Sequence, residues 1–112
     1  MAEYLEVGKA EEIGEGQVKA FKVRDKDILV AKYKAEYYAM GRYCTHRGAD
    51  LSQGSLEGKI ITCPRHGSRF DITTGESISG PKIGFLKLKT KDGPSYDVIA
   101  EGGIIKVRSR EK

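Results

Sequence analysis

The cysteine and histidine residues of this chain are confined to one stretch of 23 residues, where they form two short groups. Cys44 and His46 make up the first group, Cys63 and His66 make up the second, and 16 residues separate His46 from Cys63. Each group offers one thiolate and one imidazole, which are ligands that zinc and iron–sulfur centres take from proteins. If one metal centre uses all four side chains, two loops that are distant in sequence must meet, and this constrains the fold strongly.

Three interpretations of these four side chains are open at this point. A disulfide between Cys44 and Cys63 leaves both imidazoles unexplained. A structural zinc ion accepts two sulfur and two nitrogen ligands, but zinc modules tend to pair Cys with Cys and His with His. An iron–sulfur centre is the third, and Gly48 and Gly67 permit tight loops whose N–H groups turn toward an anion such as a bridging sulfide.

Outside this stretch, the sequence predicts strands and almost no helix. Polar and apolar residues alternate over 17–23, as in a strand with one wet and one buried face. Other β-branched and aromatic runs are short and are separated by Gly, Pro and Asp, which is typical of sandwiches and small barrels. The expected strands cover residues 3–7, 17–23, 28–33, 37–40, 85–89, 96–100 and 104–107, with turns at 25–27, 92–94 and 101–103.

Length and composition exclude several classes of protein. The 112 residues suffice for one domain, 1–112, and the longest apolar run, Ile28 to Ala31, is far shorter than a membrane span requires. The formal net charge is +4, but basic and acidic residues are interleaved, so we expect no continuous phosphate-binding track. The first residues lack the basic and apolar stretches of a signal peptide, and two cysteines suit a reducing compartment. We therefore expect a cytoplasmic protein that binds neither membranes nor nucleic acid.

The low content of Asn and Gln bears on the temperature at which the protein works. The chain contains no Asn and only two Gln, whereas Lys, Arg and Glu together make up 30 residues. Few thermolabile amides together with many charges is the tendency of hyperthermophilic proteins. The composition therefore predicts a thermophilic protein.

The segments around the two ligand groups resemble the cluster-binding loops of Rieske iron–sulfur proteins. Cys44 to Leu51 reads C-T-H-R-G-A-D-L, and Cys63 to Asp71 reads C-P-R-H-G-S-R-F-D. Ser79 to Pro81 stands where that family has a third loop with a proline. The resemblance implies an all-β fold of stacked antiparallel sheets, a sandwich or partial barrel, with a small loop-built cluster-binding subdomain at about 42–81.

The resemblance also implies the ligand set of one Rieske-type 2Fe–2S cluster. Cys44 and Cys63 would hold one iron, and His46 and His66 would hold the other. Two ferric ions, two sulfides and two thiolates sum to a neutral cluster, whereas four thiolates leave a dianion. Because a neutral cluster accepts an electron more readily, Rieske centres lie at roughly −150 to +300 mV, against about −400 mV for plant-type ferredoxins.

Four residues near the ligands are expected to surround the cluster. Gly48 closely follows the first ligand group and permits a tight loop around the cluster, and the resemblance places Pro81 in the third loop, which covers the cluster. Ser68 stands where high-potential relatives donate a serine hydroxyl to a sulfide, and Phe70 stands where they use a tyrosine. Since a hydroxyl donor stabilises the added electron and Phe70 has none, we expect a low-to-intermediate potential.

Absent features narrow the type of Rieske protein that the chain resembles. Quinol-oxidising members are membrane anchored and carry an extra cysteine in each loop, but the matching positions here are Ala49 and Arg65. Terminal oxygenases add a mononuclear iron site with two further histidines, but this chain has no histidine besides His46 and His66. The remaining type is a ferredoxin, a soluble one-electron carrier that is not itself an enzyme. Its expected donor is a flavin-dependent NAD(P)H reductase, and its acceptor is a terminal oxygenase or another oxidoreductase.

Four arginines crowd the ligand loops, and we expect them to form a positive collar that steers an acidic partner, with Arg47 and Arg65 as its docking residues. The others are Arg42 and Arg69, and the alternative for all four is ordinary solvated charge. Two other functions stay open from the sequence. One is a Rieske-like small subunit of a larger oxidoreductase of the nitrite reductase type, and the other is a zinc-stabilised interaction module.

Overall fold

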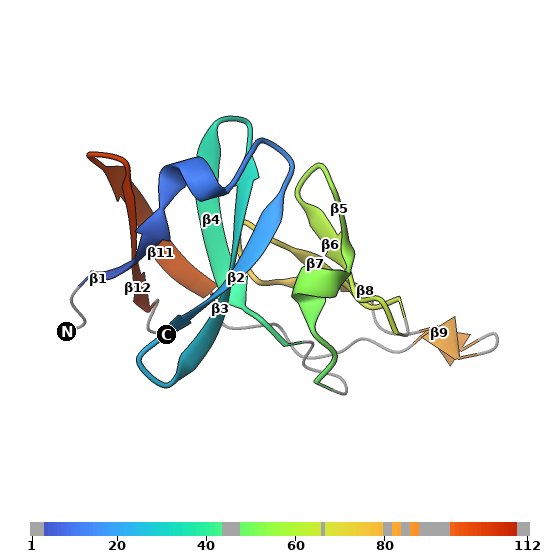
Figure 1. Ribbon diagram of the computed structural model, residues 1–112. Coiled ribbons are helices and arrows are strands. Elements are labelled where there is room, and N and C mark those ends of the chain that lie inside the picture. Colours follow the sequence, from blue (N-terminus) through green and yellow to red (C-terminus); the bar gives the residue numbers. More distant parts are fainter. Residues whose placement is uncertain are drawn as a thin grey trace.

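A computed structural model describes residues 4–43, 48–65, 67–79, 82–83, 86–87 and 95–109. The described part of the chain consists of antiparallel strands and two short 3₁₀ helices, which confirms the all-β prediction (Figure 1). Within it, no helix is long and apolar enough to cross a membrane. The largest sheet has the strand order β1-β12-β11-β4-β3-β2. Its strands are β1 (Leu5–Lys9), β2 (Val18–Val23), β3 (Lys26–Tyr33), β4 (Glu36–Gly41), β11 (Ser95–Glu101) and β12 (Ile104–Ser109).

This six-stranded sheet curls until its two outer strands approach each other, so that it is nearly a closed barrel. Gly8 on β1 lies against Phe21 on β2, and a Cβ atom at Gly8 would come within 2.6 Å of the Phe21 ring. Glycine at this position leaves room for the Phe21 ring, which a larger residue would displace. The interior of the curled sheet is an apolar core that includes Ile13, Val23, Ile28, Val30, Ala39, Tyr96, Ile105 and Val107.

A second sheet of four short strands lies beside the first, on the right of Figure 1. It consists of β5 (Ser55–Glu57), β6 (Ile60–Thr62), β7 (Arg69–Asp71) and β8 (Ser77–Ser79), paired in that order. A second apolar core joins the two sheets, with Leu29, Ala31 and Met40 from β3 and β4 and Leu51, Ile61, Cys63, Phe70 and Ile72 from the region of the small sheet. This core fixes the region of the predicted ligand loops against the barrel.

The four-stranded sheet corrects one expectation. Residues 42–81 were expected to be built from loops, but they contain these four strands and the 3₁₀ helix η2 (Leu51–Gln53). Each strand has three residues, which is too short for an alternating pattern to be visible in the sequence. The boundaries of a separate cluster-binding subdomain stay a prediction.

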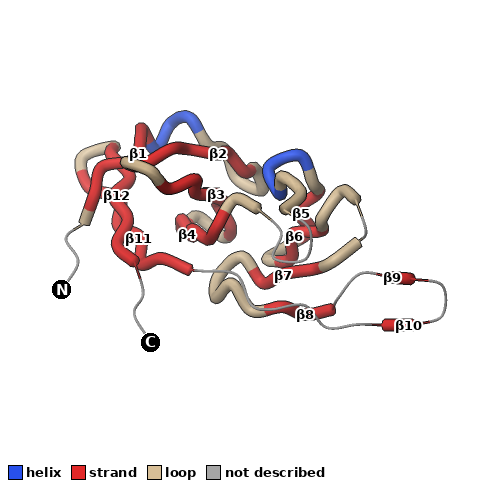
Figure 2. The backbone as a smooth tube through the Cα atoms, turned by 90° about the horizontal axis from the view of Figure 1, so that it is seen from below, coloured by secondary structure: helices blue, strands red, loops and turns tan. Residues whose placement is uncertain are grey.

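The turns agree with the sequence in one hairpin and shift in another. Gly102 and Gly103 join β11 to β12 with φ of +58° and +80°, as a two-residue turn of the primed type requires. The turn before β3 lies at Arg24 and Asp25 instead of 25–27, with Arg24 at φ +60°. The expected strand over 85–89 is described only at β10 (Leu86–Lys87), which pairs with β9 (Lys82–Ile83) beyond β8 (Figure 2). The turn at 92–94 lies outside the described residues.

Candidate metal centre

The second ligand group lies where β6 and β7 form a tight hairpin. Thr62 pairs with Arg69 in the ladder, and Cys63 then ends the buried part of the strand with 4% of its surface exposed. The Cys63 N–H donates to the Ser68 carbonyl at 2.7 Å, and the Gly67 N–H donates to the Cys63 carbonyl at 3.3 Å. Gly67 has φ +77°, which glycine adopts at little cost. The hairpin therefore fixes the Cys63 thiol, while His66 lies outside the described residues.

The first ligand group is described only at its two flanks. Tyr43 and Asp50 form an isolated antiparallel bridge, and the Leu51 N–H donates to the Arg42 carbonyl at 2.9 Å. Gly48, just before this bridge, has φ +72°. These contacts bring the two ends of the segment together. Its predicted functional residues Cys44, His46 and Arg47 lie outside the described residues.

A hollow of about 370 Å³ joins the two regions. Its lining comes from the flank of the first group and from the hairpin of the second: Gly48, Ala49, Asp50, Gln53, Pro64 and Arg65. The structure thus brings together the flanks of two segments that are distant in sequence, as the ligand pattern predicts. A larger hollow of about 450 Å³ lies between β4 and β11 and is lined by none of the predicted site residues.

Ser68 is the one buried side chain in the described part of the chain whose polar atom has no hydrogen-bond partner there. Ser68 lies five positions after Cys63, and 0% of its surface is exposed. Buried hydroxyl groups are nearly always hydrogen bonded, because leaving one unpaired costs about 1–3 kcal/mol. The Ser68 hydroxyl therefore points to an acceptor that the described part of the chain does not supply.

Comparison with known proteins identifies the family. The Rieske [2Fe-2S] domain matches residues 3–90 of the chain. The chain belongs to the Rieske family. A ferredoxin component of the naphthalene 1,2-dioxygenase system of Pseudomonas aeruginosa is 41% identical over 91 residues, which is 81% of each chain. A ferredoxin component of naphthalene 1,2-dioxygenase/salicylate 5-hydroxylase systems from Ralstonia sp is 37% identical over 98 residues, 88% of each chain.

A solved structure agrees with these relatives. A chain in the complex of reduced oxygenase and oxidised ferredoxin of carbazole 1,9a-dioxygenase superposes with a TM-score of 0.81 at 29% identity. The superposition covers 97% of this chain and 95% of that one. The protein is thus a Rieske electron carrier that holds one Rieske-type 2Fe–2S cluster. This finding decides against the zinc-stabilised module.

The described residues fit such a cluster. The Cys63 thiol is free and buried, and the partnerless Ser68 hydroxyl is a donor suited to a sulfide acceptor. Phe70 is fully buried on β7 and packs in the core between the sheets, so it contributes shape but no hydroxyl. The roles of Gly48, Ser68 and Phe70 beside the cluster stay predictions, and Pro81 lies outside the described residues.

The expected collar of four arginines needs a correction at Arg42. Its guanidinium group binds Asp50 through two hydrogen bonds, of 3.1 Å and 2.8 Å, and lies 3.5 Å from an Asp27 oxygen. Two carboxylates therefore offset this charge, which leaves Arg42 poorly suited to attract a partner. Arg65 and Arg69 are exposed.

Sequence reasoning missed Asp50, which ties the flank of the first ligand group together. Its Oδ1 atom accepts the Ser52 N–H at 3.0 Å and the Ser52 hydroxyl at 2.6 Å, so it also caps η2. The sequence Asp-Leu-Ser is a signal for such a turn, because Asp side chains commonly bond the backbone two residues on. The ion pair with Arg42 leaves no comparable signal.

Asp50 should make stability depend on pH in the acidic range. The hydrogen bond from Arg42, helped by those from Ser52 and opposed by burial, lowers the Asp50 pKa to about 2. Because this pKa is below that of the unfolded chain, the carboxylate stabilises the protein fully above about pH 4 and loses that effect as pH falls through about 2. We expect the free energy of unfolding of the wild-type protein to exceed that of Asp50→Asn by about 1–2 kcal/mol at pH 6. At pH 2 the two free energies should be almost equal. Urea unfolding of both proteins at a series of pH values measures the difference, and a constant difference would contradict this prediction.

Proposed function

We propose that this chain receives electrons one at a time from a flavin-dependent NAD(P)H reductase and delivers them to a terminal oxygenase that hydroxylates aromatic rings. The main support is the similarity, over more than four fifths of each chain, to ferredoxin components of naphthalene dioxygenase systems. The fold similarity to a chain of an oxygenase–ferredoxin complex supports the same acceptor class. The reductase is inferred from the carrier's need for a one-electron donor.

We further propose Cys44 and Cys63 as ligands of one iron and His46 and His66 as ligands of the other. The bound cluster would supply a reversible one-electron step at a potential above that of all-cysteine clusters. The chain would hold the Cys63 thiol in the buried core that also contains Phe70 and Leu51, and would offer the Ser68 hydroxyl as a donor to the cluster.

Reconstitution tests this proposal. The purified protein should be red-brown, with about two irons and two acid-labile sulfides per chain, and should take up one electron. Added to a flavin reductase and a naphthalene-type oxygenase, it should restore NADH-dependent product formation that neither enzyme shows alone. Stable co-purification with a large chain, without turnover of any ring-hydroxylating oxygenase, would instead favour the role of a small subunit of a larger oxidoreductase.

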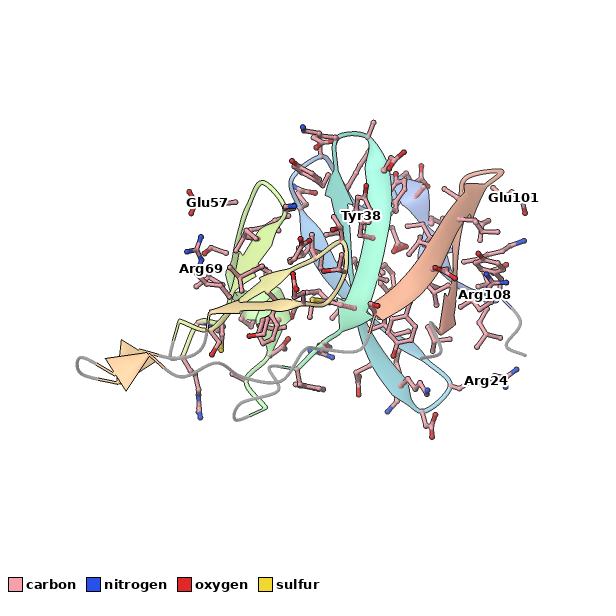
Figure 3. The ribbon with its side chains drawn as sticks, turned by 180° about the vertical axis from the view of Figure 1, so that it is seen from behind. Arg24, Tyr38, Glu57, Arg69, Glu101 and Arg108 are labelled. Atoms are coloured by element: carbon pink, nitrogen blue, oxygen red, sulfur yellow. The ribbon has the colours of Figure 1, made fainter. Side chains whose placement is uncertain are left out.

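Charge at the docking face should control the rate of electron transfer. If Arg65 and Arg47 attract an acidic partner, the second-order rate of reduction should fall as salt rises past roughly 0.1 M, where the Debye length is about 10 Å. Arg65→Glu or Arg47→Glu should be slow already at low salt and should respond less to added salt. Arg24→Glu is the matched control, since Arg24 is exposed on the turn before β3, far from Arg69 (Figure 3). Equal rates for all three variants would make these arginines ordinary surface charge.

Compartment and working temperature are also proposed from the sequence. Two cysteines, both assigned as cluster ligands, suit a reducing compartment, which we take to be the cytoplasm. The lack of Asn and the 30 Lys, Arg and Glu residues support a thermophilic protein. A melting temperature for the loaded protein within the mesophilic range of about 45–65 °C would contradict the second proposal.

A further inference from the structure

The first ligand group is followed by a turn whose aspartate reaches back across the segment. Asp50 accepts both the N–H and the hydroxyl of Ser52, and the residue between them, Leu51, is fully buried. The Leu51 N–H donates to the carbonyl of Arg42, two residues before Cys44, at 2.9 Å. The Arg42 side chain then pairs with the other Asp50 oxygen at 2.8 Å. We call Arg42 and Asp50 the first clamp.

The second ligand group is enclosed in the same way. Asp71 accepts the Thr73 N–H at 2.9 Å and the Thr73 hydroxyl at 2.6 Å, and the intervening Ile72 is fully buried. The Ile72 N–H donates to the carbonyl of Lys59, four residues before Cys63, at 2.8 Å. The Lys59 ammonium group pairs with the other Asp71 oxygen at 3.3 Å. We call Lys59 and Asp71 the second clamp.

The repetition matters because the two clamps share four features. In each, a basic residue precedes the ligand group, an aspartate follows it, a buried apolar residue bonds back to the basic residue, and a hydroxyl residue completes the turn. Independent surface ion pairs have no reason to reproduce this arrangement around both ligand groups and in the same order. The shared arrangement indicates a shared task, which is to bring together the two ends of each ligand segment.

The clamps differ where the backbone around them differs. Three residue pairs between β6 and β7 already close the second segment, and its clamp has one ion-pair contact from a lysine whose side chain is 53% exposed. Among its described residues, the first segment has a single bridge, between Tyr43 and Asp50, and its clamp has a two-pronged arginine. Arg42 is also tied to β3, because its N–H donates to the Asp27 carbonyl at 3.2 Å. The two-pronged clamp thus lies at the segment whose described flanks share one bridge, and the single-contact clamp lies at the segment closed by a three-pair ladder.

We propose that Arg42 and Asp50 are positioning residues for the iron–sulfur site, and that Lys59 and Asp71 play the equivalent, weaker part for the second ligand segment. This inference rests on the proposed ligand set. The first clamp fixes the spacing of the flanks of the first ligand segment and joins them to the six-stranded sheet. The two-pronged geometry of arginine performs this task, not its charge alone.

Arg108 provides a matched control. It pairs with Asp97 at 3.1 Å and its guanidinium group lies 4.5 Å from the centre of the Tyr4 ring, just as Arg42 pairs with Asp50 and lies 5.3 Å from the centre of the Tyr43 ring. Arg108 is on β12, at the opposite side of the molecule from Arg69 and the small sheet (Figure 3). Arg108→Gln therefore removes the same charge and the same kinds of contact far from the ligand segments.

The test compares cluster-loaded wild type, Arg42→Gln, Arg42→Lys, Asp50→Asn and Arg108→Gln. Cluster loss is followed by visible absorption in excess iron chelator, and the reduced cluster is examined by electron paramagnetic resonance. We expect Arg42→Gln and Asp50→Asn to lose the cluster about tenfold faster than wild type, because residues that orient metal ligands commonly have effects of this size. The g values of the reduced cluster should also shift in both variants. Arg108→Gln should match wild type. Arg42→Lys should resemble Arg42→Gln, because lysine keeps the charge but not the two-pronged bond.

Several results would overturn the inference. Arg42→Gln and Asp50→Asn indistinguishable from Arg108→Gln would make the first clamp an ordinary ion pair. Arg42→Lys indistinguishable from wild type would mean that charge alone matters. If Arg42→Gln fails to fold, Arg42→Lys and Asp50→Asn decide, since asparagine keeps an oxygen for Ser52. A wild-type protein without a 2Fe–2S cluster would instead refute the proposed function itself.

Discussion

Cys63→Ser should abolish cluster binding and, with it, the protection of the four-stranded sheet. Cys63 is buried in the core that joins the two sheets, and strands β5 to β8 have only three residues each. Such short strands in a chain of 112 residues bury little surface of their own, so a metal centre that ties two segments contributes folding free energy that the core does not supply. Cys44→Ser and His66→Ala should act alike if they are ligands.

Hydrogen exchange read by mass spectrometry measures this effect. Peptides covering 55–79 should exchange at least tenfold faster in Cys63→Ser than in wild type, whereas peptides covering 18–41 in the six-stranded sheet should change little. Ile61→Val is the control, because it trims the same core by one methylene at a cost of about 0.5–1.5 kcal/mol and keeps every ligand. Unchanged exchange over 55–79 in the colourless variant would show that the sheet is stable without the cluster.

The long strands were predictable from the sequence because each has enough residues for its pattern of burial to appear as a pattern of polar and apolar residues. In β2 the exposed Lys19 and Lys22 stand between less exposed apolar residues, and β3 holds four consecutive buried residues, Ile28 to Ala31, that face the two cores. Gly102 and Gly103 marked the last hairpin, since two successive positive φ values favour glycine. These signals are local, so a single sequence contains them.

The small sheet and the clamps were not predictable, because neither leaves a local signal in the sequence. A three-residue strand such as β7 places only one side chain, Phe70, firmly in the core, and no period can be read from one residue. The Arg42–Asp50 pair depends on how the segment between them folds back, which the spacing of two charges does not reveal. The Asp-x-Ser/Thr turns can be predicted from the sequence, but the ion pair that each aspartate forms with a preceding basic residue cannot.

The candidate site shows both limits in one place. Spacing alone selected Cys44, His46, Cys63 and His66, and the resemblance added Ser68, whose hydroxyl is buried and partnerless in the described part of the chain. The arginine collar was partly wrong, because charge counted along a sequence says nothing of the carboxylates that fold against it. Asp27 and Asp50 reach Arg42 from β3 and from the far flank of the ligand segment.

Ser68→Ala should lower the midpoint potential of the cluster. Reduction adds negative charge, so a hydroxyl that donates to the cluster stabilises the reduced form more than the oxidised form. A hydrogen bond to a charged group contributes about 1.5–3 kcal/mol, which corresponds to roughly 60–130 mV for one electron. Because only the difference between the two oxidation states counts, we expect a decrease of several tens of millivolts, at most about 100 mV.

The starting value and two variants make this measurement decisive. With Phe70 in place of a hydroxyl donor, wild type should lie in the lower half of the Rieske range, below roughly +100 mV. Phe70→Tyr should raise the potential if its hydroxyl reaches a cysteine sulfur, although the added atom strains a fully buried position by about 1–3 kcal/mol. Ser77→Ala, which removes a buried hydroxyl from β8 in the same sheet, should leave the potential within a few millivolts. A spectroelectrochemical titration in which Ser68→Ala and Ser77→Ala agree would remove Ser68 from the site, and a wild-type midpoint near +300 mV would refute the argument from Phe70.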